Sequence, residues 1–159
     1  MKTLFFALLS YVIIILQISC NKNSPSAPCT PKTVASEEPT IVGYASSSGI
    51  NATRDSSGVY YKIDSLGSGP APDINSKVFI TYTGKLLNGT VFDRQAIAAQ
   101  TGYQLGSLIR GLQIGLPLIK KGGGIKLIIP SSLAFGCNGY GGVPPNAIVQ
   151  YDVQLVDVQ

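Results

Sequence analysis

The side chains that most often carry out catalysis are sparse in this sequence. Histidine is absent from all 159 residues, which removes the commonest general base, the commonest metal ligand and every Ser-His or Cys-His nucleophile pair. The three cysteines, Cys20, Cys29 and Cys137, are too few for a Cys-rich zinc site or a disulfide-stapled scaffold. We therefore expect no metal ion and no cofactor, and much of acid–base and nucleophilic enzymology is excluded.

Charge and composition limit the partners and the architecture. The formal net charge is +4, and the basic residues form no continuous run, which argues against nucleic acid as a partner. The 18 glycines and 10 prolines predict many turns and favour short strands over long helices. The length suits one domain with a single core, together with an export signal and a tether.

The first twenty residues have the pattern of an export signal. Lys2 supplies a positive start, and residues 4–18 form an apolar run of signal-peptide length, short for a membrane span. The run stops at a serine followed by Cys20, which resembles the lipobox of bacterial lipoproteins, although Leu16 lies one position further upstream than usual. We predict a lipoprotein signal peptide over residues 1–19 and lipidation of Cys20. The alternative is an ordinary secretory signal with a coincidental cysteine.

Residues 20–57 are expected to form a lipidated tether and an irregular extension. Residues 21–38 are rich in Pro, Ser and Asn and have no apolar period, so we predict disorder there, with a short helix starting over residues 37–44. After lipidation of Cys20, the only possible internal disulfide would join Cys29 to Cys137. We expect it not to form, because nothing in the sequence orders a flexible tether against a distant loop.

From Gly58 onward, alternating apolar residues predict a series of short strands. Asn88-Gly89 is a strong hairpin signal between two of them. Apolar residues at helical spacing predict one short helix over residues 107–119, weakened by two glycines and a proline. The pieces predict an α+β fold in which an antiparallel sheet is covered by the only helix long enough to do so. The expected strands are residues 59–64, 77–83, 91–93, 103–106, 125–129 and 149–155.

Four segments carry a pattern that goes beyond periodicity. They are Tyr82-Thr-Gly-Lys-Leu-Leu-Asn-Gly-Thr-Val-Phe-Asp93, Leu108-Ile-Arg-Gly-Leu112, Ile129-Pro-Ser-Ser-Leu-Ala-Phe-Gly136 and Val143-Pro-Pro-Asn-Ala-Ile-Val-Gln-Tyr-Asp-Val-Gln-Leu155. In this order and at this spacing they resemble the FKBP family of peptidyl-prolyl cis-trans isomerases. The resemblance covers residues 58–159, which we take as the isomerase domain.

The resemblance implies a curved antiparallel β-sheet wrapped around one short amphipathic α-helix, with an aromatic-lined cleft that acts on X-Pro bonds. Within it, Leu112 would form the floor, the backbone N–H of Ile109 would bond a ligand carbonyl, and Asp93 would be the polar group at the rim. The catalytic positions implied are Asp93, Phe92 and Tyr82. The substrate-binding positions implied are Tyr103, Leu108, Ile109, Leu112, Phe135, Tyr140, Val143 and Tyr151.

Some of these residues have simpler interpretations. The aromatic residues Tyr82, Phe92 and Tyr151 could be plain core residues, and Asp93 could cap a turn after the Asn-Gly hairpin. The ordered motifs favour the cleft. Three positions differ from the usual pattern of active members, because the floor is Leu112 where Trp is common, a ligand-binding tyrosine is replaced by Phe135, and Thr101 stands at an often aromatic position.

The expected partners follow from the resemblance and from the signal. We predict proline-containing polypeptide clients, attachment to a bacterial membrane through the lipid on Cys20, a location in the cell envelope and a monomeric state. The alternative function is a non-catalytic module that binds proline-containing segments or acts as a chaperone.

Overall fold

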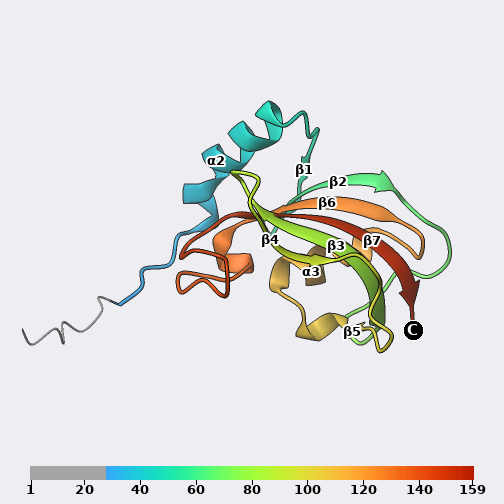
Figure 1. Ribbon diagram of the computed structural model, residues 1–159. Helices are drawn as coiled ribbons and strands as arrows, with labels where there is room; N and C mark the ends of the chain where they lie inside the picture. Colours follow the sequence, from blue (N-terminus) through green and yellow to red (C-terminus); the bar gives the residue numbers. More distant parts are fainter. Residues whose placement is uncertain (1–27) are drawn as a thin grey trace, which may run out of the picture.

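The computed structural model describes residues 28–159, so the predicted signal peptide and Cys20 lie outside the described residues. Its main element is a 7-stranded antiparallel sheet with the order β1-β2-β6-β7-β3-β4, in which β5 also pairs with β3 (Figure 1). The strands are β1 Thr53–Arg54, β2 Tyr60–Ser65, β3 Lys77–Leu86, β4 Val91–Gln95, β5 Tyr103–Gln104, β6 Gly124–Ile129 and β7 Val149–Val158.

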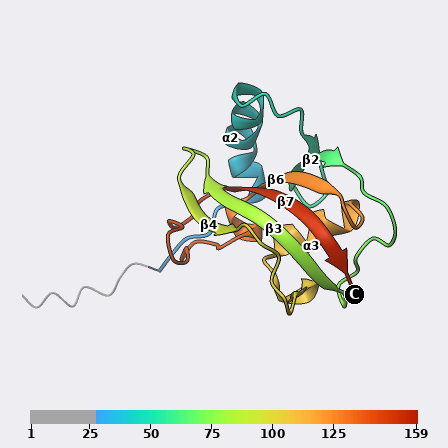
Figure 2. The same ribbon diagram turned by 45° about the vertical axis from the view of Figure 1, so that its right-hand side comes forward.

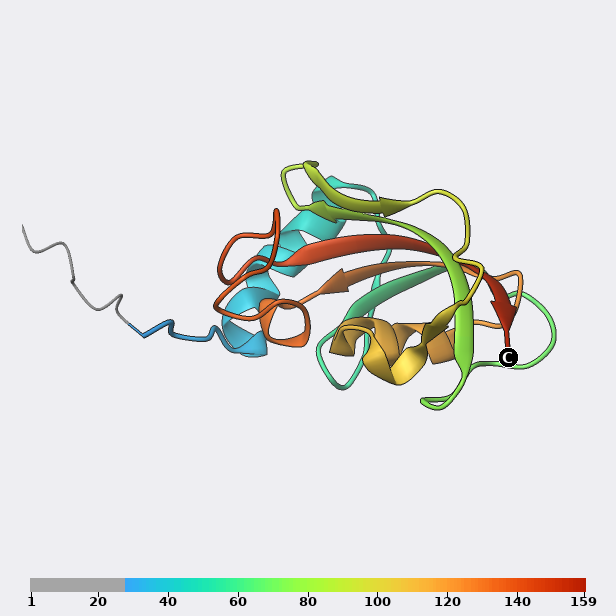
Figure 3. The same ribbon diagram turned by 60° about the horizontal axis from the view of Figure 1, so that its bottom comes forward.

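The sheet curves around helix α3 (Arg110–Gly115), which lies on its concave face between two short 3-10 helices, η2 (Leu105–Ser107) and η3 (Leu116–Leu118) (Figure 3). The helix predicted over residues 107–119 is therefore shorter than expected and broken at both ends. Gly111 and Gly115 face the sheet, and a Cβ at either position would overlap with Ile129 or Leu127. The two glycines weaken the helix by propensity but allow it to lie close to the strands.

The main core fills the space between the concave face and α3. Alternate residues of each long strand point into it, as the period of two in the sequence predicts. The Asn88-Gly89 hairpin joins β3 to β4 as expected, with Gly89 at φ 89°. The buried members of this core are Val59, Val78, Ile80, Leu105, Leu112, Leu116, Ile119, Ile125, Leu127, Ile129, Val143, Val149, Tyr151, Val153 and Leu155.

A second helix, α2 (Val34–Ser47), covers one end of the convex face (Figures 1 and 2). Thr33 caps it, because the Thr33 side chain accepts a hydrogen bond from Ser36 N–H at 3.2 Å. On its inner side, Ile41 and Ala45 pack with Tyr60 of β2 and Ile128 of β6 in a separate small core. One helix, α3, covers the apolar face as predicted, and α2 is a longer version of the short helix expected to start over residues 37–44, lying on the opposite face. The predicted tether also ends earlier than expected, because the helix begins at Val34.

The segment before α2 is fixed to the domain as well. Cys29 and Cys137 form a disulfide with a Cα–Cα distance of 5.6 Å, which corrects the expectation that this pair stays open. The side chain of Asn146 provides the contacts that order this segment, and no sequence pattern indicates them. Its Oδ1 accepts a hydrogen bond from Lys32 N–H at 3.2 Å, and its Nδ2 donates one to Thr30 O at 3.1 Å. Within residues 28–159 no helix has the length and hydropathy to cross a membrane.

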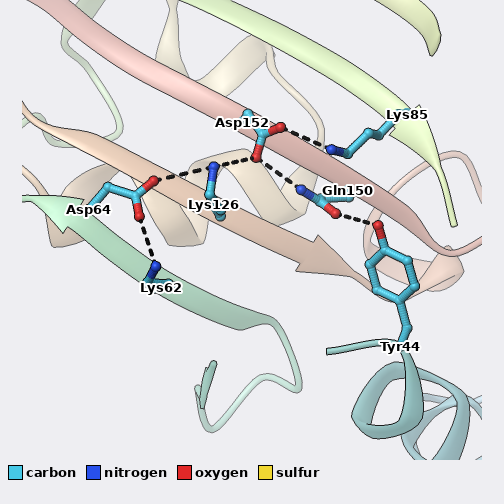
Figure 4. A network of polar contacts seen from close by, with 7 residues as sticks. All are labelled: Tyr44, Lys62, Asp64, Lys85, Lys126, Gln150 and Asp152. Atoms are coloured by element: carbon cyan, nitrogen blue, oxygen red, sulfur yellow. Dashed lines mark hydrogen bonds and ion pairs between the residues drawn. The ribbon is translucent and has the colours of Figure 1, made fainter. Parts of the chain in front are cut away.

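The rest of the convex face carries a polar network that crosses four strands (Figure 4). At its centre Lys126 lies between two carboxylates, 3.1 Å from Asp152 Oδ1 and 3.4 Å from Asp64 Oδ2. At its edge, Tyr44 of α2 donates a hydrogen bond to Gln150 Oε1 at 2.6 Å, which satisfies a residue that is only 2% exposed. The network consists of Tyr44, Lys62, Asp64, Lys85, Lys126, Gln150 and Asp152.

Candidate active site

A cavity of about 200 Å³ opens between the concave face of the sheet, α3 and the loop after η4 (Ser131–Leu133). Its lining is mostly aromatic and aliphatic, and Asp93 is the only charged residue in it. Most of the residues predicted for the cleft lie here together. The cavity is lined by Ile80, Tyr82, Asp93, Tyr103, Ser107, Leu108, Ile109, Leu112, Phe135 and Tyr151.

The polar edge of the cavity is a tyrosine–carboxylate pair. Tyr82 on β3 and Asp93 on β4 lie on paired antiparallel strands, and the Tyr82 hydroxyl donates a hydrogen bond to Asp93 Oδ2 at 2.8 Å. Asp93 is exposed at the rim, while the ring of Tyr82 is partly buried. Burial, and then the hydrogen bond to Asp93, raise the pKa of Tyr82 above its ordinary value. The hydroxyl therefore stays protonated and keeps donating to Asp93 at neutral pH.

Aromatic rings form the wall beside this pair. Phe92 meets Phe135 and Tyr151 edge to face, with both pairs of ring centroids 5.7 Å apart. Gly84 makes the arrangement possible, because a Cβ there would lie 2.8 Å from Phe92 Cζ and 3.1 Å from Tyr151 Cε1. Phe92 itself does not line the cavity. It lies behind the wall and holds the rings of Phe135 and Tyr151 in position.

Two other residues predicted to bind substrate lie outside the lining. Tyr140 is 77% exposed and stacks on Phe135, with ring centroids 6.2 Å apart and an interplanar angle of 9°. Val143 is buried in the main core and forms an isolated bridge with Tyr140, whose N–H donates to Val143 O at 3.1 Å. Tyr140 therefore extends the aromatic wall toward solvent, and Val143 supports the loop that carries it.

The floor and one rim come from the start of α3. Leu112 is 4% exposed and lies at the bottom of the cavity. Ile109 is the N-cap residue of α3, where its carbonyl accepts from Leu112 N–H at 3.0 Å. The N–H groups at the start of a helix have no acceptor within the helix, so this end of α3 can offer a donor to a ligand carbonyl.

Three residues of the site were not predicted from the sequence. Ile80 could have been found, because it alternates with Tyr82 on β3 and therefore shares its face. Ser107 lies in η2, where no periodic pattern marks it. The third is Gln113 of α3, whose Nε2 donates to Leu108 O at 2.7 Å and to Gly106 O at 3.0 Å and so fixes the backbone at the rim. No sequence signal distinguishes Gln113 from an ordinary exposed helix residue.

The residues that line the cavity determine which kind of ligand the site can bind. The cavity offers an apolar hollow closed by rings, one carboxylate with its tyrosine partner, and unused donors at a helix start. Such a site can take a small saturated ring with flanking amide groups out of water and hold the amides by hydrogen bonds.

Comparisons with known proteins agree with this geometry. A family model described as FKBP-type peptidyl-prolyl cis-trans isomerase matches residues 69–156. The chain is 40% identical over 105 residues to the FKBP-type peptidyl-prolyl cis-trans isomerase FkpA of Escherichia coli (strain K12), a match covering 65% of this chain and 39% of that protein. It is 42% identical over 104 residues to a probable FKBP-type isomerase of Haemophilus influenzae, covering 64% and 43%. The chain thus spans about two fifths of the length of these curated relatives.

Solved structures show the same likeness. The crystal structure of FkpA from Escherichia coli superposes with a TM-score of 0.69 at 34% identity, covering 79% of this chain and 61% of that chain. The crystal structure of AtFKBP13 superposes with a TM-score of 0.60 at 26% identity, covering 69% and 99%. The predicted fold class is confirmed, and the chain belongs to the FKBP-type peptidyl-prolyl cis-trans isomerase family.

Proposed function

We propose that residues 58–159 form a domain that catalyses cis-trans isomerisation of X-Pro bonds in polypeptides. The observation that carries the proposal is the cavity itself, an apolar hollow with a single polar edge formed by Tyr82 and Asp93. The proline ring would occupy the hollow, and the flanking carbonyl would accept a hydrogen bond at the start of α3, from Ile109 N–H.

The reaction suits a site without acid, base or nucleophile. Rotation about the prolyl amide meets a barrier of about 20 kcal/mol because resonance is lost as the bond twists, and no covalent bond breaks. The planar amide is more dipolar than the twisted one. Transfer from water into an apolar cavity therefore destabilises the planar ground state more than the twisted transition state.

The roles of individual residues follow from their positions. Tyr82 and Asp93 are the catalytic residues, because they form the polar edge that the rotating amide would meet. Phe92 acts as a positioning residue, since it touches the lining rings and not the cavity. Substrate contacts are assigned to the lining residues that the sequence predicted for substrate binding and to Tyr140 at the mouth, with Val143 as a support. The assigned contacts are Tyr103, Leu108, Ile109, Leu112, Phe135, Tyr140 and Tyr151.

The test is the exchange rate of a proline tetrapeptide measured by NMR with and without the protein. Wild-type protein should accelerate exchange, and Asp93→Ala should lower the acceleration about tenfold, the effect of losing one hydrogen bond to a charged group. Arg94→Ala is the matched control, because Arg94 follows Asp93 on β4 and lines a groove on the other face of the sheet. No acceleration by wild-type protein would contradict the enzyme assignment.

A non-catalytic module that binds proline-containing segments is the second candidate. It is favoured by the small floor residue, Leu112, and by Phe135, which lacks the hydroxyl that ligand-binding members have at that position. Tight binding of the peptide, seen as chemical-shift changes at the cavity residues without faster exchange, would support it over catalysis.

We further propose that the chain is exported and held at a bacterial membrane by a lipid on Cys20, within the cell envelope. The disulfide between Cys29 and Cys137 supports export, because disulfides persist mainly in oxidising compartments. The intact mass of protein extracted from membranes should match a chain that begins at a lipidated Cys20. A mass that matches the unmodified chain, or release of the protein into the soluble fraction, would contradict the anchor.

A further inference from the structure

The chain before the isomerase domain contacts the segment that carries one wall of the cavity. We call residues 28–47 the N-terminal clamp and residues 131–146 the pocket loop. The pocket loop begins at η4 and carries Phe135 of the cavity lining, Tyr140 at the mouth and the buried Val143. It is closed at its neck by a hydrogen bond from Asn146 N–H to Gly136 O at 3.0 Å.

The N-terminal clamp is bonded to the pocket loop at both ends of this closing hydrogen bond, at Cys137 beside Gly136 and at Asn146. On one side Cys29 forms the disulfide with Cys137, the residue after Gly136. On the other side the Asn146 side chain bonds the backbone of Thr30 and Lys32, at 3.1 Å and 3.2 Å. Asn146 is the one residue other than glycine with a positive φ, 54°, among residues 28–159. Its backbone conformation is unfavourable for most residues, so side-chain bonds to the clamp help to maintain it.

A third contact lies deeper. Glu37 of α2 is 2% exposed, and its Oε2 accepts a hydrogen bond from Ser131 N–H at 2.8 Å. Among the described residues this N–H is the only hydrogen-bond partner of the Glu37 carboxylate. Burial of a carboxylate is unfavourable unless hydrogen bonds compensate it, and an apolar side chain would fill the same place without that cost. The bond to Ser131 is therefore the specific contribution of Glu37.

Ser131 in turn organises the turn that leads to Phe135. Its carbonyl accepts hydrogen bonds from Ala134 N–H at 3.1 Å and from Gly136 N–H at 2.8 Å. Ser131, whose N–H is bound by Glu37, is thus hydrogen-bonded through its carbonyl to the two residues that flank Phe135. A shift of Ser131 would move the ring of Phe135 and with it the stacked ring of Tyr140.

We infer that the N-terminal clamp holds the pocket loop in its substrate-binding conformation. In this arrangement Glu37 is a positioning residue, and the Cys29–Cys137 disulfide is a covalent link that a reductant would break. The inference rests on the proposed function, because it concerns the same cavity. Reduction by a dithiol breaks the S–S bond with two electrons and two protons, giving two thiols, while the dithiol becomes a disulfide. The N-terminal clamp would then be joined to the loop only through the Asn146 and Glu37 contacts.

The test compares Glu37→Ala, Glu37→Gln and dithiothreitol-treated wild-type protein by hydrogen exchange of the pocket loop and by peptide kinetics. In Glu37→Ala, exchange of the Ser131, Ala134 and Gly136 amides should become about tenfold faster or more, as expected for loss of a charged hydrogen bond. The KM for a proline peptide should rise several-fold with kcat little changed, because Tyr82 and Asp93 are untouched. Glu37→Gln keeps an acceptor oxygen and should restore most of both values.

Glu38→Ala is the matched control. Glu38 follows Glu37 on α2, but its carboxylate binds the Tyr60 hydroxyl at 2.7 Å and Arg54 at 2.9 Å and does not contact the pocket loop. It should leave loop exchange and KM unchanged. Reduction of the wild-type disulfide tests the clamp without any substitution, and slow exchange of the β6 and β7 amides shows that the domain stays folded. Faster exchange confined to the pocket loop is expected.

Two outcomes overturn the inference. One is loop exchange that is unchanged both in Glu37→Ala and after reduction. The other is a rise in exchange spread evenly over the sheet, which would make Glu37 a residue of general stability. Hydrogen exchange needs no catalysis, so wild-type protein that fails to isomerise peptides would overturn the proposed function while loop exchange still decides whether the clamp exists.

Discussion

On strand β7, Val153 and Leu155 are buried against the concave face, whereas Asp152 and Gln154 on the opposite side line a polar groove. The same strands therefore build two surfaces of opposite character. The concave surface is mainly apolar, and the one charged residue of the cavity lining, Asp93, lies at the rim beside Tyr82. The convex surface carries a network of ion pairs and hydrogen bonds, and α2 covers one end of it (Figure 4).

The two faces of the sheet contribute differently to the free energy of folding and to the active site. Burial of an aliphatic side chain contributes about 2 kcal/mol, while a partly exposed ion pair contributes about 0.5 kcal/mol. The concave face thus supplies most of the stability, and it also forms the cavity. The convex face carries the ion pairs and the residues on which α2 packs, and Glu37 of α2 contacts the pocket loop.

The largest effect is expected from the concave face away from the cavity. Leu127 is fully buried and packs against Gly115 of α3. Leu127→Ala should lower the free energy of unfolding by about 3 kcal/mol, because it removes apolar contacts and leaves a hole under the helix. Urea denaturation measures the change. Val156→Ala is the control on the same sheet, because Val156 is 47% exposed and should change stability by no more than about 0.5 kcal/mol.

A smaller and more specific effect is expected at the polar pair of the cavity. Tyr82→Phe keeps the ring but removes the hydrogen bond to Asp93, so kcat/KM for a proline peptide should fall about fivefold, or about 1 kcal/mol. Tyr103→Phe is the matched control, because the Tyr103 hydroxyl donates to the neutral Gln95 at 3.1 Å and its loss should cost less. Equal losses in the two variants would show that the charge of Asp93 has no special part in the reaction.

The same pair predicts a pH dependence. Burial and the hydrogen bond to Asp93 raise the pKa of Tyr82, so its hydroxyl should not ionise as the pH passes 10, the ordinary value for tyrosine. The rate of peptide exchange, with the background subtracted, should therefore stay level from pH 7 to about 10. A fall centred near pH 10 that disappears in Tyr82→Phe would contradict this assignment.

The concave face could be predicted from the sequence because it follows local rules. Alternation places Val153 and Leu155 on one side, and Asn88-Gly89 marks the turn between β3 and β4, so strand positions and the sheet face follow without knowledge of the rest of the chain. The motif residues of the cleft lie on these elements. Gln113 and Ser107 were not predicted as site residues. Their side chains bond the backbone of one short segment, and such bonds leave no periodic pattern in the sequence.

The convex side could not be predicted in the same way. The composition of residues 28–38 suggests disorder, and α2 is stabilised by contacts that lie far away in the sequence. A signal was nevertheless present, since Tyr60 and Ile128 are apolar residues on a face that otherwise carries Lys62 and Lys126. Two apolar positions on a polar face indicate a covering element. The disulfide, which joins residues separated by 108 positions, had no such signal.

The smallest effect is expected in the polar network. Partial burial of Asp152 raises its pKa, but hydrogen bonds from Lys126, Gln150 and Lys85 outweigh this and hold the pKa below its ordinary value. A carboxyl group whose pKa is lowered by folding stabilises the fold at pH values above its unfolded pKa of about 4. That contribution is lost as the pH falls through the folded pKa.

Asp152→Asn should therefore reduce the free energy of unfolding by about 0.5–1 kcal/mol at pH 7, the range of a partly exposed ion-pair network. The difference from wild-type protein should shrink as the pH falls below 4, because the Asp152 carboxyl takes up a proton first in the unfolded chain and, at a lower pH, in the folded protein. Asp64→Asn, which removes contacts at 3.3 Å to Lys62 and 3.4 Å to Lys126, should have a smaller effect. If Asp152→Asn lowered stability as much as Leu127→Ala, the convex face would be as important for stability as the concave one.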